Sequence, residues 1–168
     1  MHLYTGCGKG KTTAALGLAF RALGHGRRVF LIQFLKKGGY FGEIKAARRF
    51  DKFKILQTGR KGWVVRDKLS LKDKQLAQKG LRLAAQAIAS KKYDLVILDE
   101  LNLTLHFGLL AIQEVKEILK MRSAKVEVVI TGREAHPEIM KMADLISEIK
   151  EVKHYYRKGT PARKGIEY

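Results

Sequence analysis

The sequence has very few residues of the kinds that cross-link a chain or bind metals through sulfur. Its 168 residues include one cysteine, Cys7, and two prolines. A single cysteine excludes an intramolecular disulfide framework and a cysteine-based metal cluster, which fits a reducing compartment. The five histidines are scattered and lack the spacing of metal ligands.

Long apolar stretches are also missing. No run approaches the roughly 18 apolar residues that a membrane span requires. The start, Met1-His2-Leu3-Tyr4, has neither the charged leader nor the apolar core of a signal peptide. We therefore expect a soluble, cytoplasmic protein that does not enter a membrane.

Acidic residues are scarce relative to basic ones. The chain has 16 Asp and Glu against 34 Lys and Arg, which gives a formal net charge of +18. A surface this positive attracts acidic partners, such as nucleic acid, a polyanionic small molecule or an acidic protein. The alternative is a solvated, lysine-rich surface suited to high temperature. Charge alone does not decide between them.

Short apolar runs alternate with longer segments of helical period, at 12–23, 72–89 and 111–120. Because parallel strands need crossovers, this alternation predicts one α/β domain over 1–168, with a mainly parallel sheet and helices on both faces. The tail, 155–168, lacks periodicity, and we expect an extended segment that the body of the domain or a ligand orders. The six candidate strands are 3–5, 29–32, 53–56, 95–98, 126–130 and 145–152.

A glycine-rich run lies between the first predicted strand and the first predicted helix: Gly6-Cys7-Gly8-Lys9-Gly10-Lys11-Thr12-Thr13. This is the context of a phosphate-binding loop, in which backbone N–H groups and the helix N-terminus face phosphate oxygens. Lys11 would neutralise phosphate charge, and Thr12 offers a hydroxyl to Mg²⁺. The usual pattern has glycine in place of Thr5, which weakens the match to the pattern and leaves the mechanics intact. A glycine-rich turn without a ligand is disfavoured by the order strand, loop, lysine, threonine and helix.

Two acids, Asp99 and Glu100, end an apolar strand. A carboxylate at this point reaches the magnesium beside a phosphate loop. Arg133 follows the next apolar strand at the same edge of the sheet, where it would reach a ligand or a phosphate. A surface arginine with no such role is the other reading.

These motifs and several others resemble the P-loop-type ATP:corrinoid adenosyltransferases, over residues 2–168. The phosphate loop is one such motif. The others are Leu98-Asp99-Glu100-Leu101-Asn102, Thr131-Gly132-Arg133, Ala143-Asp144-Leu145, Val152-Lys153-His154 and Gly165-Ile166-Glu167-Tyr168.

The resemblance implies a P-loop (RecA-like) fold, a homodimer, and attack by a Co(I) corrinoid on the 5′ carbon of ATP with release of tripolyphosphate. Cobalt is then the nucleophile, which agrees with the lack of a recognisable Ser-His-Asp or Cys-His set. Lys11, Thr12 and Glu100 would be the catalytic residues. Thr12 and Glu100, with Asp99 beside them, would bind Mg²⁺ or Mn²⁺.

The resemblance also places Trp63 in an apolar wall beside the corrinoid, although a plain core tryptophan is the alternative. The family usually has a second aromatic residue where this chain has Lys61, and glutamine where it has Arg163. Cys7 stands where asparagine is common, and an N-terminal extension found in some members is missing. A positive face would steer a corrinoid with free carboxylates or an acidic flavoprotein reductant.

A second class of function is a basic RecA-like ATPase or binding module that acts on nucleic acid. The charge and the phosphate loop favour it. The sequence has no recognition-helix signature, no zinc finger and no strand of interleaved aromatic and basic residues that would stack bases. We therefore expect no specific nucleic-acid partner.

Overall fold

The computed structural model describes residues 1–38, 40–62 and 64–168, and within them six strands form one sheet. Every neighbouring pair of strands is parallel, in the order β3-β2-β4-β5-β1-β6. The predicted α/β class and parallel sheet are confirmed. The strands are β1 His2–Thr5, β2 Val29–Phe34, β3 Phe53–Thr58, β4 Leu95–Asp99, β5 Glu127–Thr131 and β6 Leu145–Glu148.

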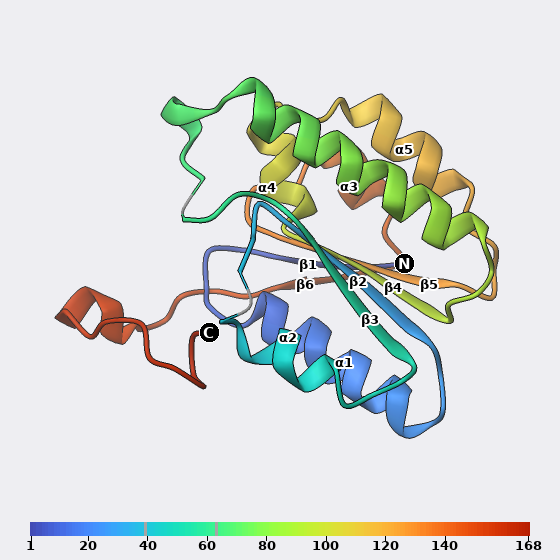
Figure 1. Cartoon of the computed structure of the whole chain (residues 1–168). Coiled ribbons are helices and arrows are strands. Elements are labelled where there is room, and N and C mark those ends of the chain that lie inside the picture. The colour runs from blue at the N-terminus through green and yellow to red at the C-terminus, as the bar shows by residue number, and fades with distance from the viewer. Residues whose placement is uncertain (39, 63) are drawn as a thin grey trace.

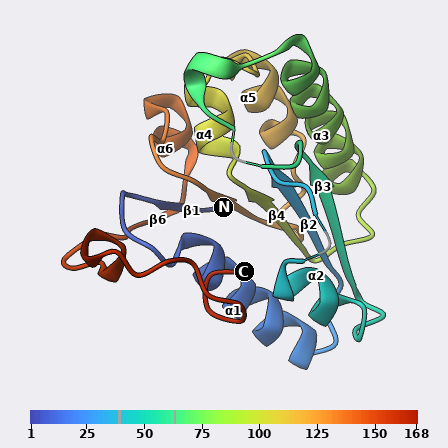
Figure 2. The ribbon, with the colours of Figure 1, turned by 60° about the vertical axis from the view of Figure 1, so that its left-hand side comes forward.

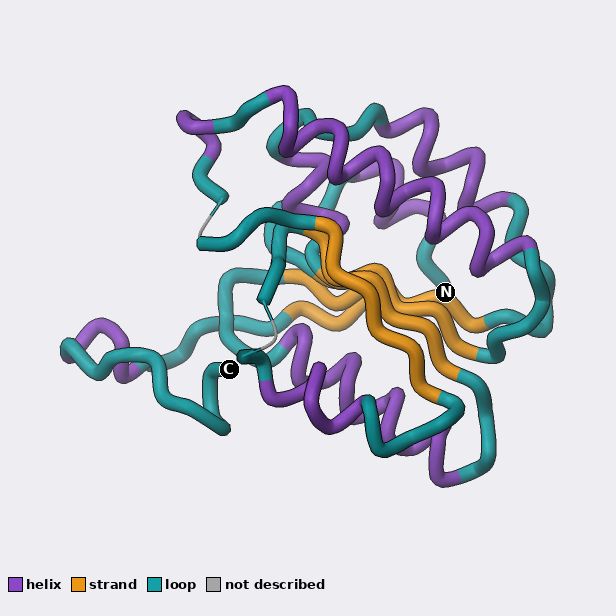
Figure 3. Tube along the Cα trace, in the orientation of Figure 1, coloured by secondary structure: helices purple, strands orange, loops and turns teal. Residues whose placement is uncertain are grey.

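Helices cover both faces of this sheet, as Figure 1 shows and the tube in Figure 3 makes plain. Helices α1 and α2 lie on one face, and α3, α4 and α5 lie on the other. None of the helices in the described ranges is long and apolar enough to cross a membrane. Their bounds are α1 Lys11–Gly24, α2 Gly42–Ala47, α3 Leu71–Ala89, α4 Leu101–His106, α5 Ile112–Lys120 and α6 Pro137–Met142.

The period-two alternation of the central strands divides the core into two layers. In β2, Val29 and Leu31 pack with Ala15 and Ala19 of α1. The alternate residues of β2, Phe30, Ile32 and Phe34, belong to the larger cluster under α3 and α5. Both faces of β2 are buried along its whole length, because helices cover them on either side. This explains why its sequence is a continuous apolar run.

The parallel order brings the carboxyl ends of all six strands to one edge of the sheet. The phosphate loop follows β1, and Asp99 ends β4, with only β5 between the two strands. Ligands of open α/β sheets bind outside this edge. The topology therefore assembles the predicted site residues from segments far apart in sequence.

Two predicted boundaries differ from the structure at the end of the chain. The predicted strand 145–152 stops at Glu148, where pairing with β1 ends at Thr5. The backbone then crosses behind the phosphate loop, where the Gly8 N–H donates to the Ile149 carbonyl at 2.7 Å. The tail, expected to be extended, contains a 3-10 helix over Tyr155–Lys158.

Close packing between α3 and the sheet depends on Gly80. A Cβ atom at Gly80 would lie 2.4 Å from Thr58 Oγ1 and 2.6 Å from Phe34 Cε1. Gly17, in the middle of α1, has no atom within 4 Å of the same position. The two helical glycines therefore form a matched pair that differs in packing.

We expect Gly80→Ala to lower the free energy of unfolding by about 1–3 kcal/mol, because the methyl group overpacks the helix–sheet contact. Gly17→Ala should raise it by up to about 1 kcal/mol, since alanine is the better helix former in open space. Urea unfolding of the two variants measures both changes. Equal effects of the two substitutions would contradict the packing described for Gly80.

Candidate functional site

The phosphate loop is held in shape from inside and from behind. Lys11 is 7% exposed, and its Nζ donates to the carbonyl oxygens of Gly6 and Gly8 at 2.7 Å each. Gly6 has φ of 96°, and a Cβ atom there would lie 2.5 Å from the Ile149 carbonyl oxygen. Glycine is therefore required on both conformational and steric grounds. Burial, followed by the charge of Arg133, lowers the pKa of Lys11.

The carboxylate of Asp99 is the centre of the site. It is fully buried, and its Oδ1 accepts hydrogen bonds from Thr12 Oγ1 at 2.8 Å and from Thr131 Oγ1 at 2.6 Å. Its Oδ2 accepts from Lys36 Nζ at 2.8 Å. Burial alone would raise the pKa of Asp99, but the Lys36 charge and the hydrogen bonds lower it. Asp99 is therefore a buried anion with its own counter-charge.

Glu100 stands next to this carboxylate in a strained conformation. Its φ of 64° is left-handed, which costs a non-glycine residue about 1–2 kcal/mol. The Glu100 N–H donates to Thr131 Oγ1 at 3.1 Å, and its carbonyl accepts from Thr104 Oγ1 at 2.8 Å. Burial, and then the charge of Asp99, raises the pKa of Glu100. Such strain at the end of a strand is typical of functional sites.

The donor set here consists of oxygens, namely the Thr12 hydroxyl and the Asp99 and Glu100 carboxylates. Mg²⁺ and Mn²⁺ prefer such ligands, so the residues fit the cation. In the described ranges, no three His, Cys, Asp or Glu side chains gather closely enough to hold a metal ion by themselves. A divalent cation would therefore need further oxygens from phosphate and water, as Mg²⁺ commonly does.

Two other predicted site residues, Cys7 and Arg133, are exposed. Cys7 lies on the phosphate loop. Arg133 is exposed, and its charge lowers the pKa of both Lys11 and Glu100, so it belongs to the same edge. Trp63, predicted to line the corrinoid, lies outside the described residues.

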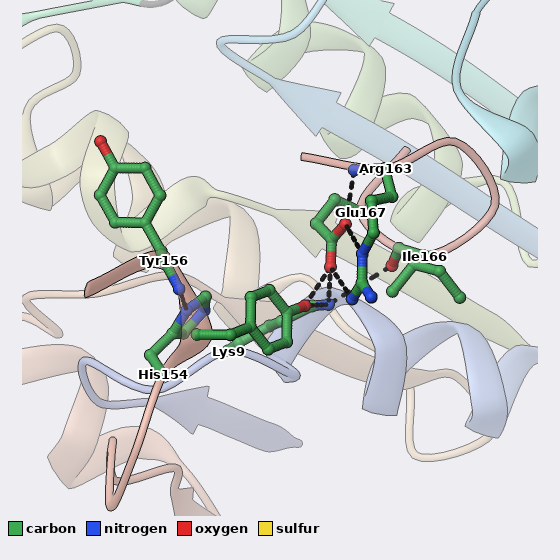
Figure 4. A network of polar contacts seen from close by, with 7 residues as sticks. Lys9, His154, Tyr156, Arg163, Ile166 and Glu167 are labelled. Atoms are coloured by element: carbon green, nitrogen blue, oxygen red, sulfur yellow. Dashed lines mark hydrogen bonds and ion pairs between the residues drawn. The ribbon is translucent and has the colours of Figure 1, made fainter. Parts of the chain in front are cut away.

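The C-terminal tail contacts the phosphate loop through a polar network that Figure 4 shows. The Glu167 carboxylate accepts from Lys9 Nζ at 2.7 Å, from the Arg163 N–H at 2.6 Å and from the Tyr155 hydroxyl. These donors, Lys9 first, hold the pKa of Glu167 well below its usual range. The end of the tail then returns to the body, where Tyr168 lies beside Gly42 at the start of α2 (Figure 2).

Comparison with known proteins decides the family. The chain matches the model of the family described as ATP:corrinoid adenosyltransferase BtuR/CobO/CobP over residues 1–168. The chain belongs to this family. The match covers every element that builds the site, from the phosphate loop to the tail.

Individual relatives agree with this assignment. A corrinoid adenosyltransferase of Pseudomonas aeruginosa is 36% identical, and the aligned region covers 99% of this chain and 82% of the relative. The enzyme of Escherichia coli K12 is 36% identical, with 99% and 84% covered. The corrinoid adenosyltransferase CobA of Salmonella typhimurium is 37% identical, with 99% and 84% covered.

A solved structure supports the fold. A KaiC-like protein of Pyrococcus horikoshii superimposes with a TM-score of 0.56 and 14% identity, over 90% of this adenosyltransferase chain and 72% of that chain. At this identity the likeness concerns architecture alone. It agrees with the P-loop fold that the sequence predicts.

Sequence reasoning did not find Lys36 or the anchoring role of the tail. Lys36 lies two residues beyond the end of β2, at the same carboxyl edge as Asp99, and this position was a usable signal. Thr131 was noted only as part of a turn, yet its hydroxyl joins Asp99 to the Glu100 backbone. The contact of Glu167 with Lys9 had no signal in sequence spacing, because 158 positions separate the two residues.

We expect Glu167→Gln to loosen the tail, because an amide binds Lys9 and Arg163 less strongly than a carboxylate does. Amide hydrogen exchange in residues 163–168 should become several-fold faster. Glu151→Gln is the control, since Glu151, which precedes the tail, pairs with Arg157 and not with the Glu167 network. The lowered pKa of Glu167 means that this contact is complete above the ordinary glutamate pKa and is lost only in stronger acid. Protection should therefore be the same at about pH 7 and about pH 5, after correction for intrinsic exchange. Loss of protection between these pH values, or no effect of Glu167→Gln, would contradict the network.

Proposed function

We propose that this chain transfers the 5′-deoxyadenosyl group of ATP to the cobalt of a Co(I) corrinoid. The Co(I) centre donates an electron pair to the 5′ carbon, so a Co–C bond forms as the C–O bond breaks. The bonding pair leaves with tripolyphosphate. The family match over all of residues 1–168 is the observation that carries this proposal.

The chain's task in such a reaction is to hold the triphosphate as a leaving group and to align the ribose carbon. We assign the triphosphate to the loop from Gly6 to Thr13, with Lys11 as its main counter-charge. The buried position of Lys11 favours this, because a charge contact is stronger where water is excluded. Arg133, at the same edge, adds a second positive charge.

Thr12 and Glu100, with Asp99 beside them, would hold Mg²⁺ or Mn²⁺ beside the triphosphate. When bound, the cation neutralises charge on the leaving group. The raised pKa of Glu100 fits this role, because a carboxyl that is buried and lies beside another anion is stabilised in its charged form by a nearby cation. No side-chain nucleophile is needed, since the corrinoid supplies it.

We further propose that Trp63 contacts the corrinoid and that the active form is a homodimer in the cytoplasm. The net charge of +18 would steer an acidic flavoprotein reductant or a corrinoid with free carboxylates toward the chain. The nucleic-acid ATPase is not favoured, because the three relatives described above are all named corrinoid adenosyltransferases.

The products distinguish the two classes of function. With Mg-ATP, a corrinoid and a strong reductant under anaerobic conditions, we expect a light-sensitive adenosylated corrinoid and tripolyphosphate in equal amounts. Without the corrinoid, almost no ADP or phosphate should form, because nothing in the sequence marks a residue that would position water for attack on the γ-phosphate. Absorbance spectroscopy and anion chromatography measure these products.

Nucleic acid should not stimulate turnover, even where the positive surface binds it weakly. The proposed adenosyl transfer is wrong if ADP forms rapidly, nucleic acid accelerates ADP release, and no adenosylated corrinoid appears. That result would leave the basic ATPase as the function.

Cys7 gives an independent test of the loop as the ATP site. It is the sole cysteine of the chain, and its side chain is exposed. We expect saturating Mg-ATP to slow its alkylation at least about tenfold. A triphosphate bound to the loop covers the side chain and blocks access of the alkylating reagent to the reactive thiolate. In Lys11→Ala, which lacks the main counter-charge, protection should require much more ATP. Equal alkylation rates with and without ATP in the folded protein would place the nucleotide elsewhere.

A further inference from the structure

Lys36 contacts the centre of the site and has no role in the function proposed above. It lies two residues beyond the end of β2, and its side chain is 23% exposed. Its Nζ donates to Asp99 Oδ2 at 2.8 Å. Asp99 itself is fully buried, so Lys36 is the side-chain cation in direct contact with this anion among the described residues.

We propose that Lys36 is a positioning residue of the metal and triphosphate site, and that it acts through Asp99. The inference rests on the proposed Mg-ATP site. In it, Lys36 fixes the Asp99 carboxylate so that Oδ1 stays directed at the Thr12 hydroxyl. Thr12 then donates its hydrogen to Asp99 and keeps its oxygen lone pairs for the cation.

The hydrogen bonds of Asp99 support an indirect role for this acid. Oδ1 accepts two hydroxyl hydrogens, from Thr12 and Thr131. Oδ2 accepts from Lys36 and, at 3.5 Å, from Gln33 Nε2. Oδ1 therefore has both acceptor positions in use, and Oδ2 is paired with the Lys36 ammonium. Asp99 orients Thr12 rather than binding the cation, which leaves Thr12 and Glu100 as the protein's direct ligands.

The backbone around Lys36 is fixed by its neighbours. Leu35 has a left-handed φ of 59°, which turns the chain sharply after β2. Gly59 packs on this turn so closely that a Cβ atom there would lie 2.2 Å from the Lys36 nitrogen. Close packing of the turn at its base helps to orient the Lys36 side chain toward Asp99.

The same turn connects the proposed metal site with the end of β3, which precedes the predicted corrinoid residue Trp63 in the sequence. Gly59 follows β3 directly, and it lies on the Leu35–Lys36 peptide. On the same turn, the Gly38 N–H donates to Gln57 Oε1 at 2.8 Å. Lys36 therefore lies between the end of β4, where we place the metal and ATP, and the end of β3, which precedes the residue proposed to contact the corrinoid.

The test compares ATP affinity with excess Mg²⁺ and with EDTA, by calorimetry, in the absence of a corrinoid. The dissociation constant in EDTA divided by the dissociation constant with Mg²⁺ measures what the metal contributes to ATP binding. We expect Lys36→Met to reduce this ratio about tenfold, the usual effect of losing a residue that orients a metal ligand. ATP affinity in EDTA should change much less. Lys37→Met, an exposed neighbour on the same turn, is the matched control and should leave the ratio unchanged.

A double variant separates action through Asp99 from a direct effect on the triphosphate. If Lys36 acts through Asp99, Lys36→Met/Asp99→Asn should lose no more of the ratio than Asp99→Asn alone. This variant also removes both charges together, so it avoids an unpaired buried anion if Lys36→Met folds poorly. The inference is wrong if the ratio falls in the double variant by the product of the two single-variant reductions, or if Lys36→Met leaves the ratio unchanged. Either result would leave the proposed function standing, whereas failure of the unmodified chain to bind Mg-ATP would remove both.

Discussion

The buried carboxylate of Asp99 is the interaction on which the rest of the site depends. It receives hydrogen bonds from residues that follow or end three other strands: Thr12 after β1, Lys36 after β2 and Thr131 at the end of β5. A buried anion is costly unless hydrogen bonds and an opposite charge compensate it. Each of these segments is therefore held in register at the carboxyl edge by the same group, and the phosphate loop is positioned as a result.

The parts of the structure with local signals could be predicted from the sequence. The phosphate loop was recognisable because glycines, Lys11 and Thr12 lie in one short run between a strand and a helix. Asp99 was recognisable because an acid after an apolar strand has a known place in a parallel sheet. Helices α2, α4 and α6 were missed because six residues are too few to show a helical period. Lys36 was missed because 63 positions separate it from Asp99, and only the strand order brings the two together.

The distribution of charge also differs from a simple count. A net charge of +18 suggests repulsion between basic side chains, yet two lysines at the carboxyl edge of the sheet pair with particular anions. Lys36 pairs with Asp99, and Lys9 pairs with Glu167. The sequence composition predicted a positive surface, but not that acids would organise the lysines nearest the proposed chemistry.

The strand order has a consequence for how the protein is made. β1, which precedes the phosphate loop, emerges from the ribosome before the other strands of this sheet, but its two neighbours are β5 and β6, the last of the six described strands to emerge. Pairing over such separations closes long loops and slows folding. The strand before the phosphate loop must remain unpaired during synthesis until β5 has emerged, and the Lys9–Glu167 contact forms later still. A nascent chain that stalls before β6 therefore cannot complete the edge of the sheet at which we place the nucleotide.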